Sequence, residues 1–554
     1  MPAPTPLTQC DPPQLDWSRS GTPAATDFGD IYFSVDGGLA ETETVFLKAC
    51  GLPERWQGQQ RFTIGELGFG SGLNFLAAWR MWETTKPKGG RLHFVSIEKF
   101  PFDAPQIKQA LSVWPELEPY SAQLIKSWPG RVKGFHRLHF GDVTLTLIHD
   151  DISNALDELD AKIDAWFLDG FSPSKNPDMW SVEMMQKLAM LSAPGAKIGT
   201  FTVAGAVRNA LTEAGFTVEK KEGFGRKRHR LEAYFPGEIQ DATTPPTPTI
   251  IGAGIAGASL VKAFARRGIT ANVLHKADHP AASHNAAALI KPRLDLQDRP
   301  ESRFFLGSYI YALNAYEPQA LKIGVIHIPK SEAETERYIK LNNQAPLSRE
   351  HFSFDDAQNK LALNKSLLIE PKSVLGDWLS DISLSETAMT SAELTILAAG
   401  FGIRDMLKDD DIPLRFSRGQ LTWAEAEIET PTTYGGYALP LKEGLLLGAT
   451  HQRLDGVNPF DLKPEDDVQN LNNFEKFTGV KVRQAKAPSR ASVRVTTADT
   501  LPMMGQLEDG RWILTGLGSR GFVFAPLLAE AIVSKICGDP MPIAKSVWDK
   551  FGIR

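Results

Sequence analysis

The stretch Thr243–Gly257 reads TTPPTPTIIGAGIAG and decides how the chain is organised. Its first half, rich in proline and threonine, has the composition of a semi-rigid linker. A short β-branched run at 249–251 then enters Gly252-Ala-Gly254-Ile-Ala-Gly257, a full GxGxxG. Glycines in this pattern, after a strand and before a helix, open a dinucleotide-binding βαβ unit. The stretch therefore predicts two enzymes in one chain: a domain at 1–240, a linker at 241–247 and a second domain at 248–554.

The composition is that of a large globular protein. The chain has 554 residues, of which 42% are apolar, and a net charge of -6. Such a charge argues against a protein that coats nucleic acid over its whole surface, although a local basic patch remains compatible. The three cysteines, Cys10, Cys50 and Cys537, are widely separated and form no CxxC pair, so we expect no metal site and a reducing compartment.

No segment has the features of a membrane or secretion signal. The N-terminus, MPAPTPLTQCDPP, lacks both a basic region and an apolar core. The longest apolar stretch, 521–533, contains Pro526 and Glu530 and is too short to span a bilayer. We expect a cytoplasmic protein without membrane contact; its oligomeric state stays open, with a monomer favoured.

The first half contains a strand that runs into a glycine-rich turn. The predicted strand, 61–64, leads into Glu66-Leu-Gly68-Phe-Gly70-Ser-Gly72-Leu-Asn74, after an earlier predicted helix at 41–50. Such a turn places backbone N–H groups beside a ligand. An acid at the strand end repels phosphates but suits a cation such as S-adenosylmethionine.

Three further predicted strands also end in acids. Residues 92–97 precede Glu98, residues 143–148 precede Asp150-Asp151, and residues 165–168 precede Asp169. The ends of parallel strands line one crevice, where ligands bind. Each acid alone is equally well explained as a helix N-cap. Four of them, each after an apolar strand, favour a methyltransferase.

This half resembles class I S-adenosylmethionine-dependent methyltransferases. The resemblance implies that the turn glycines approach the methionine part, that Glu98 holds the ribose and that Asp151 meets the adenine amine. Asp169, in DGFSPSKNPDMW, is the candidate that orients or deprotonates an amine, because methyl transfer needs a free lone pair; the alternative is a loop cap. The cofactor-binding candidates are Glu66, Gly68, Gly70, Gly72, Asn74, Glu98 and Asp151.

A basic run, KKEGFGRKRHR at 220–230, closes the first half. Charge runs are often solvated faces, but beside an active site this one would seat a polyanion. We take Arg226, Lys227 and Arg228 as the candidate contacts to a nucleic-acid backbone.

The second half departs from an NAD-binding pattern. After a helix predicted from 257 to 267 and a strand at 270–274, His275-Lys276 stands where an acid for the ribose is expected. A small-residue loop at 283–288, an apolar strand at 394–400, Arg418-Gly-Gln420 and a late glycine-rich turn follow. In this order they resemble the FAD-dependent D-amino acid oxidase superfamily, of the glycine and sarcosine oxidase type.

That resemblance implies FAD, with its pyrophosphate at Gly252, Gly254 and Gly257. It also implies a helix N-terminus near the flavin and a β-rich substrate subdomain formed by about 305–390 and 415–490. The substrate carboxylate would meet an arginine, Arg494 or Arg520, with Tyr437 a weaker candidate. The late turn contributes Gly516, Gly518 and Gly521.

The order of the two halves is similar to the bacterial bifunctional tRNA 5-methylaminomethyl-2-thiouridine biosynthesis family. The pieces that carry this resemblance are DFGDIYFS, FGSGLNFL, SIEKFPF, DAWFLDGFSPSKNPDMW and GFGRKR. It implies an α/β fold with a Rossmann-like methyltransferase domain and an FAD-binding Rossmann domain. It also implies tRNA as substrate: removal of a carboxymethyl group from a wobble uridine, then N-methylation. The rivals are a metabolic enzyme for small N-methyl glycine derivatives and a tRNA-binding scaffold with a dead cofactor site.

Overall fold

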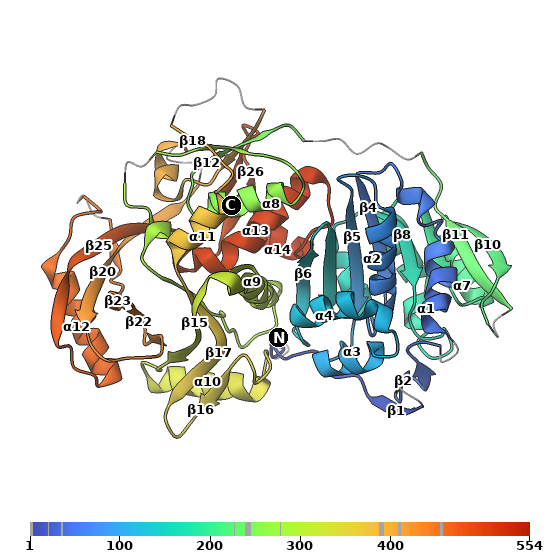
Figure 1. Cartoon of the computed structure of the whole chain (residues 1–554), viewed down its shortest axis with the longest axis horizontal. Helices are drawn as coiled ribbons and strands as arrows, with labels where there is room; N and C mark the ends of the chain where they lie inside the picture. Colours follow the sequence, from blue (N-terminus) through green and yellow to red (C-terminus); the bar gives the residue numbers. More distant parts are fainter. Residues whose placement is uncertain are drawn as a thin grey trace. The chain divides into compact units, whose positions relative to one another are not determined.

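The structure is a computed structural model that describes residues 4–19, 22–34, 37–225, 228–238, 245–276, 279–386, 393–407, 412–454 and 458–554 (Figure 1). It divides into two compact units. The N-terminal unit comprises Gln9–Thr244 with Ser534–Ser546, and the C-terminal unit comprises Met1–Thr8, Pro245–Val533 and Val547–Arg554. Within the predicted linker, residues 241–244 lie outside the described residues.

The N-terminal unit is built on an eight-stranded sheet of order β10-β11-β9-β8-β4-β5-β7-β6. The strands whose ends carry the predicted acids are neighbours and run parallel, with β4 between β8 and β5, and β7 on the far side of β5. This confirms that the acids meet at one edge of a sheet. These strands are β4 (Arg61–Leu67), β5 (Arg91–Glu98), β7 (Val143–His149) and β8 (Ile163–Leu168).

Both faces of this sheet are buried. Phe94 and Val95 are neighbours on β5, yet they belong to two different apolar clusters, because successive side chains of a strand point to opposite faces. The first cluster includes Phe75 of α2 (Leu73–Thr85), and the second includes Met185 of α6 (Val182–Leu191). A strand buried on both faces explains why the sequence shows continuous apolar runs.

Several local predictions differ from the structure. β4 extends to Leu67, so Glu66 lies within the strand and not beyond it. The helix predicted at 41–50 is α1 (Gly38–Thr42) followed by a π-helical segment, η1 (Glu43–Lys48). Three antiparallel strands toward the two edges of the sheet were not predicted; they are β6 (Gly134–Phe140), β10 (Thr217–Glu222) and β11 (His229–Tyr234).

The C-terminal unit contains two sheets (Figure 1). The first has the order β18-β13-β12-β19-β27-β26, in which β12 pairs in parallel with both β13 and β19. The GxGxxG lies between β12 and α8 (Ile255–Ala265), and the late glycine turn lies between β27 and α13 (Gly521–Cys537). The strands are β12 (Pro248–Ile251), β13 (Asn272–Leu274), β18 (Leu384–Ser385), β19 (Leu394–Leu397), β26 (Met503–Gln506) and β27 (Trp512–Thr515).

The second sheet has ten strands and confirms the β-rich substrate subdomain. Its longest pair is β20 (Leu414–Glu425) with β25 (Gln484–Thr497), which run antiparallel. Arg418 on β20 is buried and forms an ion pair with Asp466 of α12 (Pro464–Thr478). The same guanidinium donates to Gln420 Oε1 over 2.7 Å. The Arg418-Gly-Gln420 motif therefore fastens α12 to the sheet.

Within the described part of the chain, no helix is both long and apolar enough to cross a membrane. The same residues contain no group of three or more His, Cys, Asp or Glu side chains that could hold a metal ion.

Candidate active sites

A cavity of ≈ 1370 Å³ lies at the ends of the parallel strands in the N-terminal unit; we call it the N-terminal cavity. Two of its lining glycines have backbone angles that favour glycine, with φ of 92° at Gly68 and 53° at Gly70. A Cβ at Gly68 would lie 2.9 Å from the backbone oxygen of Asp169, and one at Gly70 would lie 3.0 Å from the Tyr32 ring. The turn thus leaves a narrow space beside its backbone, which a side chain at Gly68 or Gly70 would fill. It fits the S-adenosylmethionine that the sequence predicts.

An amide links two of the predicted acids. Asn74 Nδ2 donates to Asp169 Oδ2 over 2.7 Å and lies 2.9 Å from Glu66 Oε1. The other Glu66 oxygen accepts from Ser96 Oγ over 2.6 Å. Burial raises the pKa of Glu66 well above its usual range. Asn74 and Asp169 line the N-terminal cavity, whereas Glu66 lies beneath it.

Glu98 and Asp151 both line the cavity, with their carboxylates partly used by the protein. Glu98 accepts from the backbone N–H of Gly70 over 2.9 Å and from that of Phe100 over 2.8 Å, while burial raises its pKa. Asp151 Oδ1 caps α5 (Ile152–Glu158) by accepting from the Ser153 N–H. Its Oδ2 pairs with Lys99 over 2.9 Å. Burial opposes ionisation of Asp151, but the bonds from Lys99 and Ser153 prevail and lower its pKa.

The remaining predicted cofactor glycine, Gly72, does not line the N-terminal cavity among the described residues. It occupies the N-cap of α2 with a φ of 83°, and a Cβ there would lie 2.8 Å from the Phe69 ring. Its contribution is to the shape of the turn.

The basic run lies partly at this cavity. Phe224 and Gly225, between β10 and β11, line it. Arg228 is exposed, and Arg230 pairs with Glu232. Arg226 and Lys227 lie outside the described residues, so their predicted contact with nucleic acid stays a prediction.

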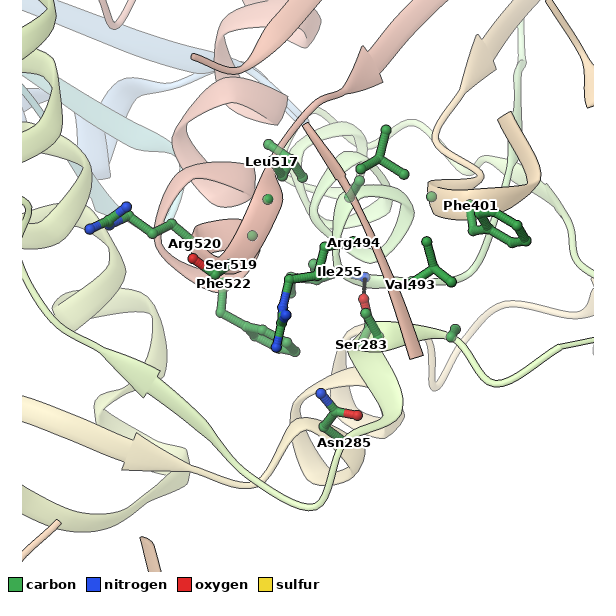
Figure 2. A pocket seen from close by; sticks show the side chains of 18 of the residues that line it. Ile255, Ser283, Asn285, Phe401, Val493, Arg494, Leu517, Ser519, Arg520 and Phe522 are labelled. Atoms are coloured by element: carbon green, nitrogen blue, oxygen red, sulfur yellow. Dashed lines mark hydrogen bonds between the residues drawn. The ribbon is translucent and has the colours of Figure 1, made fainter. Parts of the chain in front are cut away.

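The C-terminal unit holds a second cavity, of ≈ 880 Å³, which we call the C-terminal cavity (Figure 2). A Cβ at Gly252 would lie 2.4 Å from the Ala398 oxygen, and one at Gly257 only 1.8 Å from the Gly252 oxygen. Because glycine has no Cβ, the backbones of β12, α8 and β19 can approach this closely. Ser283 Oγ accepts from the Ile255 N–H over 3.0 Å at the start of α8. The cradle and the helix N-terminus fit a pyrophosphate, as FAD requires.

Most of the predicted second-half residues line this cavity. Gly257 packs behind the turn and does not reach it among the described residues. His275 and Lys276, which follow β13 and stand where an acid for a ribose would be expected, also line the cavity. The predicted residues that line it are Gly252, Gly254, Arg494, Gly516, Gly518, Arg520 and Gly521.

The two candidate arginines differ in their surroundings, and in Figure 2 their side chains point in different directions. Arg494, on β25, lies 3.4 Å from His451 Nε2 and bonds to the Tyr437 hydroxyl. Burial raises the pKa of Tyr437, against the effect of Arg494. Arg520 belongs to η8 (Gly518–Arg520), and burial lowers its pKa, with Arg293 acting in the same direction.

Sequence reasoning missed a charged group on the wall of the C-terminal cavity: Lys291, His327 and Glu334. Burial lowers the pKa of Lys291 to about 8, with Arg520 acting in the same direction and Glu334 against it. His327 bonds to Thr433 Oγ1 over 2.8 Å and lies 3.3 Å from Glu334 Oε1. Burial and the charge of Lys291 lower the pKa of His327 to about 4. The available signal was a lysine placed directly after the short apolar strand β14 (Ala288–Ile290).

Comparison with known proteins agrees with both halves. Residues 115–236 match the family described as S-adenosyl-L-methionine-dependent methyltransferase, and residues 373–535 match FAD dependent oxidoreductase. These matches confirm the two predicted cofactors. The glycine oxidase of Geobacillus kaustophilus is similar in structure, with a TM-score of 0.44 and 16% identity over 56% of this chain and 99% of that one.

Full-length relatives are more similar. The tRNA 5-methylaminomethyl-2-thiouridine biosynthesis bifunctional protein MnmC of Caulobacter vibrioides is 39% identical over 98% of this chain and 97% of its own. The protein of the same name from Maricaulis maris is 39% identical over 97% of this chain and 95% of its own. The chain therefore belongs to the family of tRNA 5-methylaminomethyl-2-thiouridine biosynthesis bifunctional proteins.

Proposed function

We propose that this chain carries out two successive reactions on uridine 34 of tRNA. The C-terminal unit removes the carboxymethyl group from 5-carboxymethylaminomethyl-(2-thio)uridine, which gives 5-aminomethyl-(2-thio)uridine. The N-terminal unit then methylates the freed amine to 5-methylaminomethyl-(2-thio)uridine. The observation that supports this most strongly is the pair of cofactor cradles, one in each unit, in a chain that matches its bifunctional relatives end to end. The assignment of residues 1–240 and 248–554 to the two activities is part of this proposal.

The first reaction is an oxidation next to an amine. FAD, when bound, accepts the two electrons released as the C–N bond of the N-substituted glycine becomes an imine. Water then adds to the imine carbon, and the bond between that carbon and the nitrogen breaks. The two carbons of the carboxymethyl group leave as glyoxylate, and the amine remains on the uridine. In this scheme the substrate carboxylate binds Arg494, whose neighbour Tyr437 supplies a second donor. Lys291 and Arg520 add positive charge to the wall of the same cavity.

The second reaction is a direct displacement at a methyl group. S-adenosylmethionine, when bound, supplies the methyl group and its leaving sulfide. The amine must present its lone pair, so it must be neutral when it attacks. Asp169 is suited to accept or hold the amine proton, because Asn74 fixes one of its oxygens at the edge of the cavity. Glu66 supports this arrangement from below, through the same amide.

The chemistry of the two steps also explains why they share a chain, since the first product is the second acceptor. A metabolic enzyme that handles small N-methyl glycine derivatives is the alternative. The basic run, of which Phe224 and Gly225 line the N-terminal cavity, favours a polyanionic substrate, because a free amino acid needs no such basic surface. A tRNA-modifying enzyme of this kind works in the cytoplasm.

The deciding experiment is nucleoside mass spectrometry of tRNA from a strain that lacks this protein. That tRNA should retain 5-carboxymethylaminomethyl-2-thiouridine. Purified protein should convert it to the 5-aminomethyl form, and addition of S-adenosylmethionine should carry it to the 5-methylaminomethyl form. Unchanged tRNA, together with turnover of free N-methylglycine, would establish the metabolic alternative.

Cofactor content offers an independent check. The purified protein should be yellow, and denaturation should release FAD, detected by absorbance and chromatography. A colourless, folded protein that cannot be reconstituted with FAD would remove the assignment of the C-terminal unit.

A further inference from the structure

The stretch DFGDIYFS (27–34), one of those that carry the family resemblance, has no role in the two reactions as described, yet it forms a wall of the N-terminal cavity. Phe28 and Tyr32 from this stretch line the cavity together with Phe171, which follows Asp169 by two residues. All three rings are half-buried, so each keeps part of its surface toward the cavity. Two segments far apart in the sequence thus place aromatic rings on the wall of one cavity, with Phe171 next to the acceptor loop and Tyr32 against Gly70 of the cofactor turn.

The rings are arranged as a platform and not as an irregular apolar lining. Phe28 and Phe171 are stacked, with centroids 4.4 Å apart and planes inclined by 23°. Tyr32 meets Phe171 edge-on at 5.4 Å. Offset stacks and edge-to-face contacts are the favoured geometries of aromatic pairs, so the group holds its own orientation.

Polar contacts fix the two segments to each other. Asp30 Oδ2 accepts from the backbone N–H of Ser172 over 3.2 Å. Lys175 Nζ donates to the Gly29 oxygen over 3.2 Å. Two hydrogen bonds thus join the segments directly after the ring pair. A surface fixed in this way loses little conformational entropy when a ligand covers it.

The stacked pair lies at the acceptor end of the cavity. Phe171 is joined to Asp169 through Gly170, where a Cβ would lie 2.0 Å from the Met179 sulfur. Met179 therefore packs directly against the backbone that joins Asp169 to Phe171, with no room for a side chain at Gly170. The residues predicted to hold adenosine, Glu98 and Asp151, belong to β5 and to the start of α5 instead. Phe28 also makes a tilted contact with Phe100, which follows β5, with centroids 6.1 Å apart.

We propose that Phe28 and Phe171 form a stacking platform for the pyrimidine base that carries the acceptor amine. Bases of single-stranded RNA loops are commonly bound by stacking on aromatic side chains. A stacked base would direct its 5-aminomethyl arm toward Asp169, since Asp169 and Phe171 line the same cavity two residues apart. This inference rests on the proposed function, because it takes tRNA as the methyl acceptor.

The test replaces each ring by an apolar side chain without a π face, as Phe28→Leu and Phe171→Leu. Stacking of one base on an aromatic ring typically changes affinity by roughly 5- to 150-fold. We expect KM for 5-aminomethyluridine tRNA to rise by a factor in this range for Phe171→Leu and by less for Phe28→Leu. Phe135→Leu is the matched control, since Phe135 is half-buried in the same unit and does not line the cavity among the described residues.

Two further measurements separate the platform from other roles. Calorimetric affinity for S-adenosylmethionine should stay within about twofold of wild type in both variants, and removal of the carboxymethyl group should be unchanged. A short anticodon stem-loop with 4-thiouridine at the acceptor position should crosslink under ultraviolet light to the segments that contain Phe28 or Phe171, as mapped by peptide mass spectrometry.

The outcomes are distinct. Equal KM values in the wild type and both variants, or a crosslink confined to other segments, would overturn the platform. Methylation of tRNA by the wild type would still support the proposed function. A loss of cofactor affinity as large as the rise in KM would assign the rings to S-adenosylmethionine and overturn the platform as well. A wild type that does not methylate tRNA at all would remove the proposed function and, with it, this inference.

Discussion

The side-chain amide of Asn74 lies 2.7 Å from Oδ2 of Asp169 and fixes that carboxylate at the edge of the N-terminal cavity. The amide comes from the start of α2 and the acid from the end of β8, so the pair joins the glycine turn to the acceptor loop. Because Asn74 also bonds to the buried Glu66, its own position is fixed from two sides. Asn74 therefore positions the Asp169 carboxylate at the cavity wall.

This relationship makes Asp169 the first target. Asp169→Asn keeps the shape of the side chain but removes the carboxylate, and loss of a positioned base typically costs ~10²–10⁴-fold in rate. We expect methylation to fall by such a factor while removal of the carboxymethyl group continues, so that the nucleoside accumulates as 5-aminomethyluridine. The control is Asp178→Asn, an exposed acid on the same cavity. Normal methylation by the Asp169 variant would reduce that residue to a loop cap.

The second prediction concerns the room left for Arg494. A Cβ on Gly419 would lie 2.6 Å from Arg494 Nη1 and 2.8 Å from the backbone oxygen of Thr450. Gly419→Ala should therefore displace the guanidinium, and a misplacement of about 1 Å in a catalytic site can cost ~10²-fold. We expect kcat/KM for removal of the carboxymethyl group to fall by about that factor, with the FAD content of the protein unchanged.

The matched control is Gly376→Ala, which adds the same methyl group in open space within α11 (Pro371–Trp378). If Gly419→Ala acts like this control, Arg494 does not bind the substrate carboxylate, and Arg520 becomes the remaining candidate.

The third prediction is a pH dependence. Burial lowers the pKa of Lys291 to about 8, so its positive charge is present at pH 7 and largely lost at pH 9. A charged hydrogen bond is worth roughly 1.5–3 kcal/mol, or about 10- to 150-fold in affinity. Since the substrate carries a carboxylate, kcat/KM for its oxidation should fall as pH rises through 8.

Lys291→Met should be slower at pH 7 and should lack the fall, because its charge is absent at every pH. Lys340→Met, at an exposed position on α10 (Glu332–Gln344), should keep the wild-type profile. A Lys291 variant that retains the same inflection near pH 8 would assign the titration to another group.

The fourth prediction concerns the segment Ser534–Ser546, which belongs to the N-terminal unit although the residues on either side of it, up to Val533 and from Val547, belong to the C-terminal unit. Within it, Asp539 is buried and accepts ion pairs from Arg61 at 3.4 Å and Arg91 at 3.1 Å. Removing one partner of a buried pair typically costs about 3–5 kcal/mol, and the partial exposure of the arginines favours the lower figure. Asp539→Ala should lower the temperature at which the N-terminal unit unfolds, measured as the loss of methyltransferase activity on heating. Asp549→Ala, at an exposed site, should not lower it.

The sequence was sufficient for the features that follow local rules. Apolar strands that end in Glu98, Asp151 and Asp169 predict a parallel sheet with one crevice, because strand ends must align at one edge. The glycine turns were equally readable, since only glycine tolerates the close backbone contacts at Gly68 and Gly252. These rules depend on residue type and spacing alone.

Features that depend on tertiary contacts were not readable in this way. Glu66 shares its sequence signal with Glu98, but an extension of β4 to Leu67 buries it beneath the cavity. Lys291 and Glu334 line the same cavity from segments far apart in the sequence, without any periodic pattern. Asp539 lies far along the chain from Arg61. Such pairings arise from the topology of the fold, which spacing in one sequence does not encode.

The last prediction concerns the basic run. Phe224 and Gly225, in the middle of the run, line the N-terminal cavity directly before Arg226, Lys227 and Arg228 in the sequence. Contacts to phosphates carry affinity and salt dependence, with a slope of about -0.7 per contact for single strands. Replacing all three by alanine should weaken tRNA binding and reduce the slope by up to about 2. Affinity for S-adenosylmethionine should persist, because Glu98 and Asp151 are untouched.

The measurement is tRNA affinity at several salt concentrations, beside a control in which three exposed lysines of the same unit, Lys108, Lys126 and Lys162, become alanine. The control removes the same net charge from places away from the cavity. It should shift affinity slightly and leave the slope nearly intact, because charges beyond a Debye length of about 8–10 Å are largely screened. Equal affinities and slopes for the wild type and the basic-run variant would make the run a solvated face. The tRNA assignment would then depend on the family relationship and on the nucleoside analysis alone.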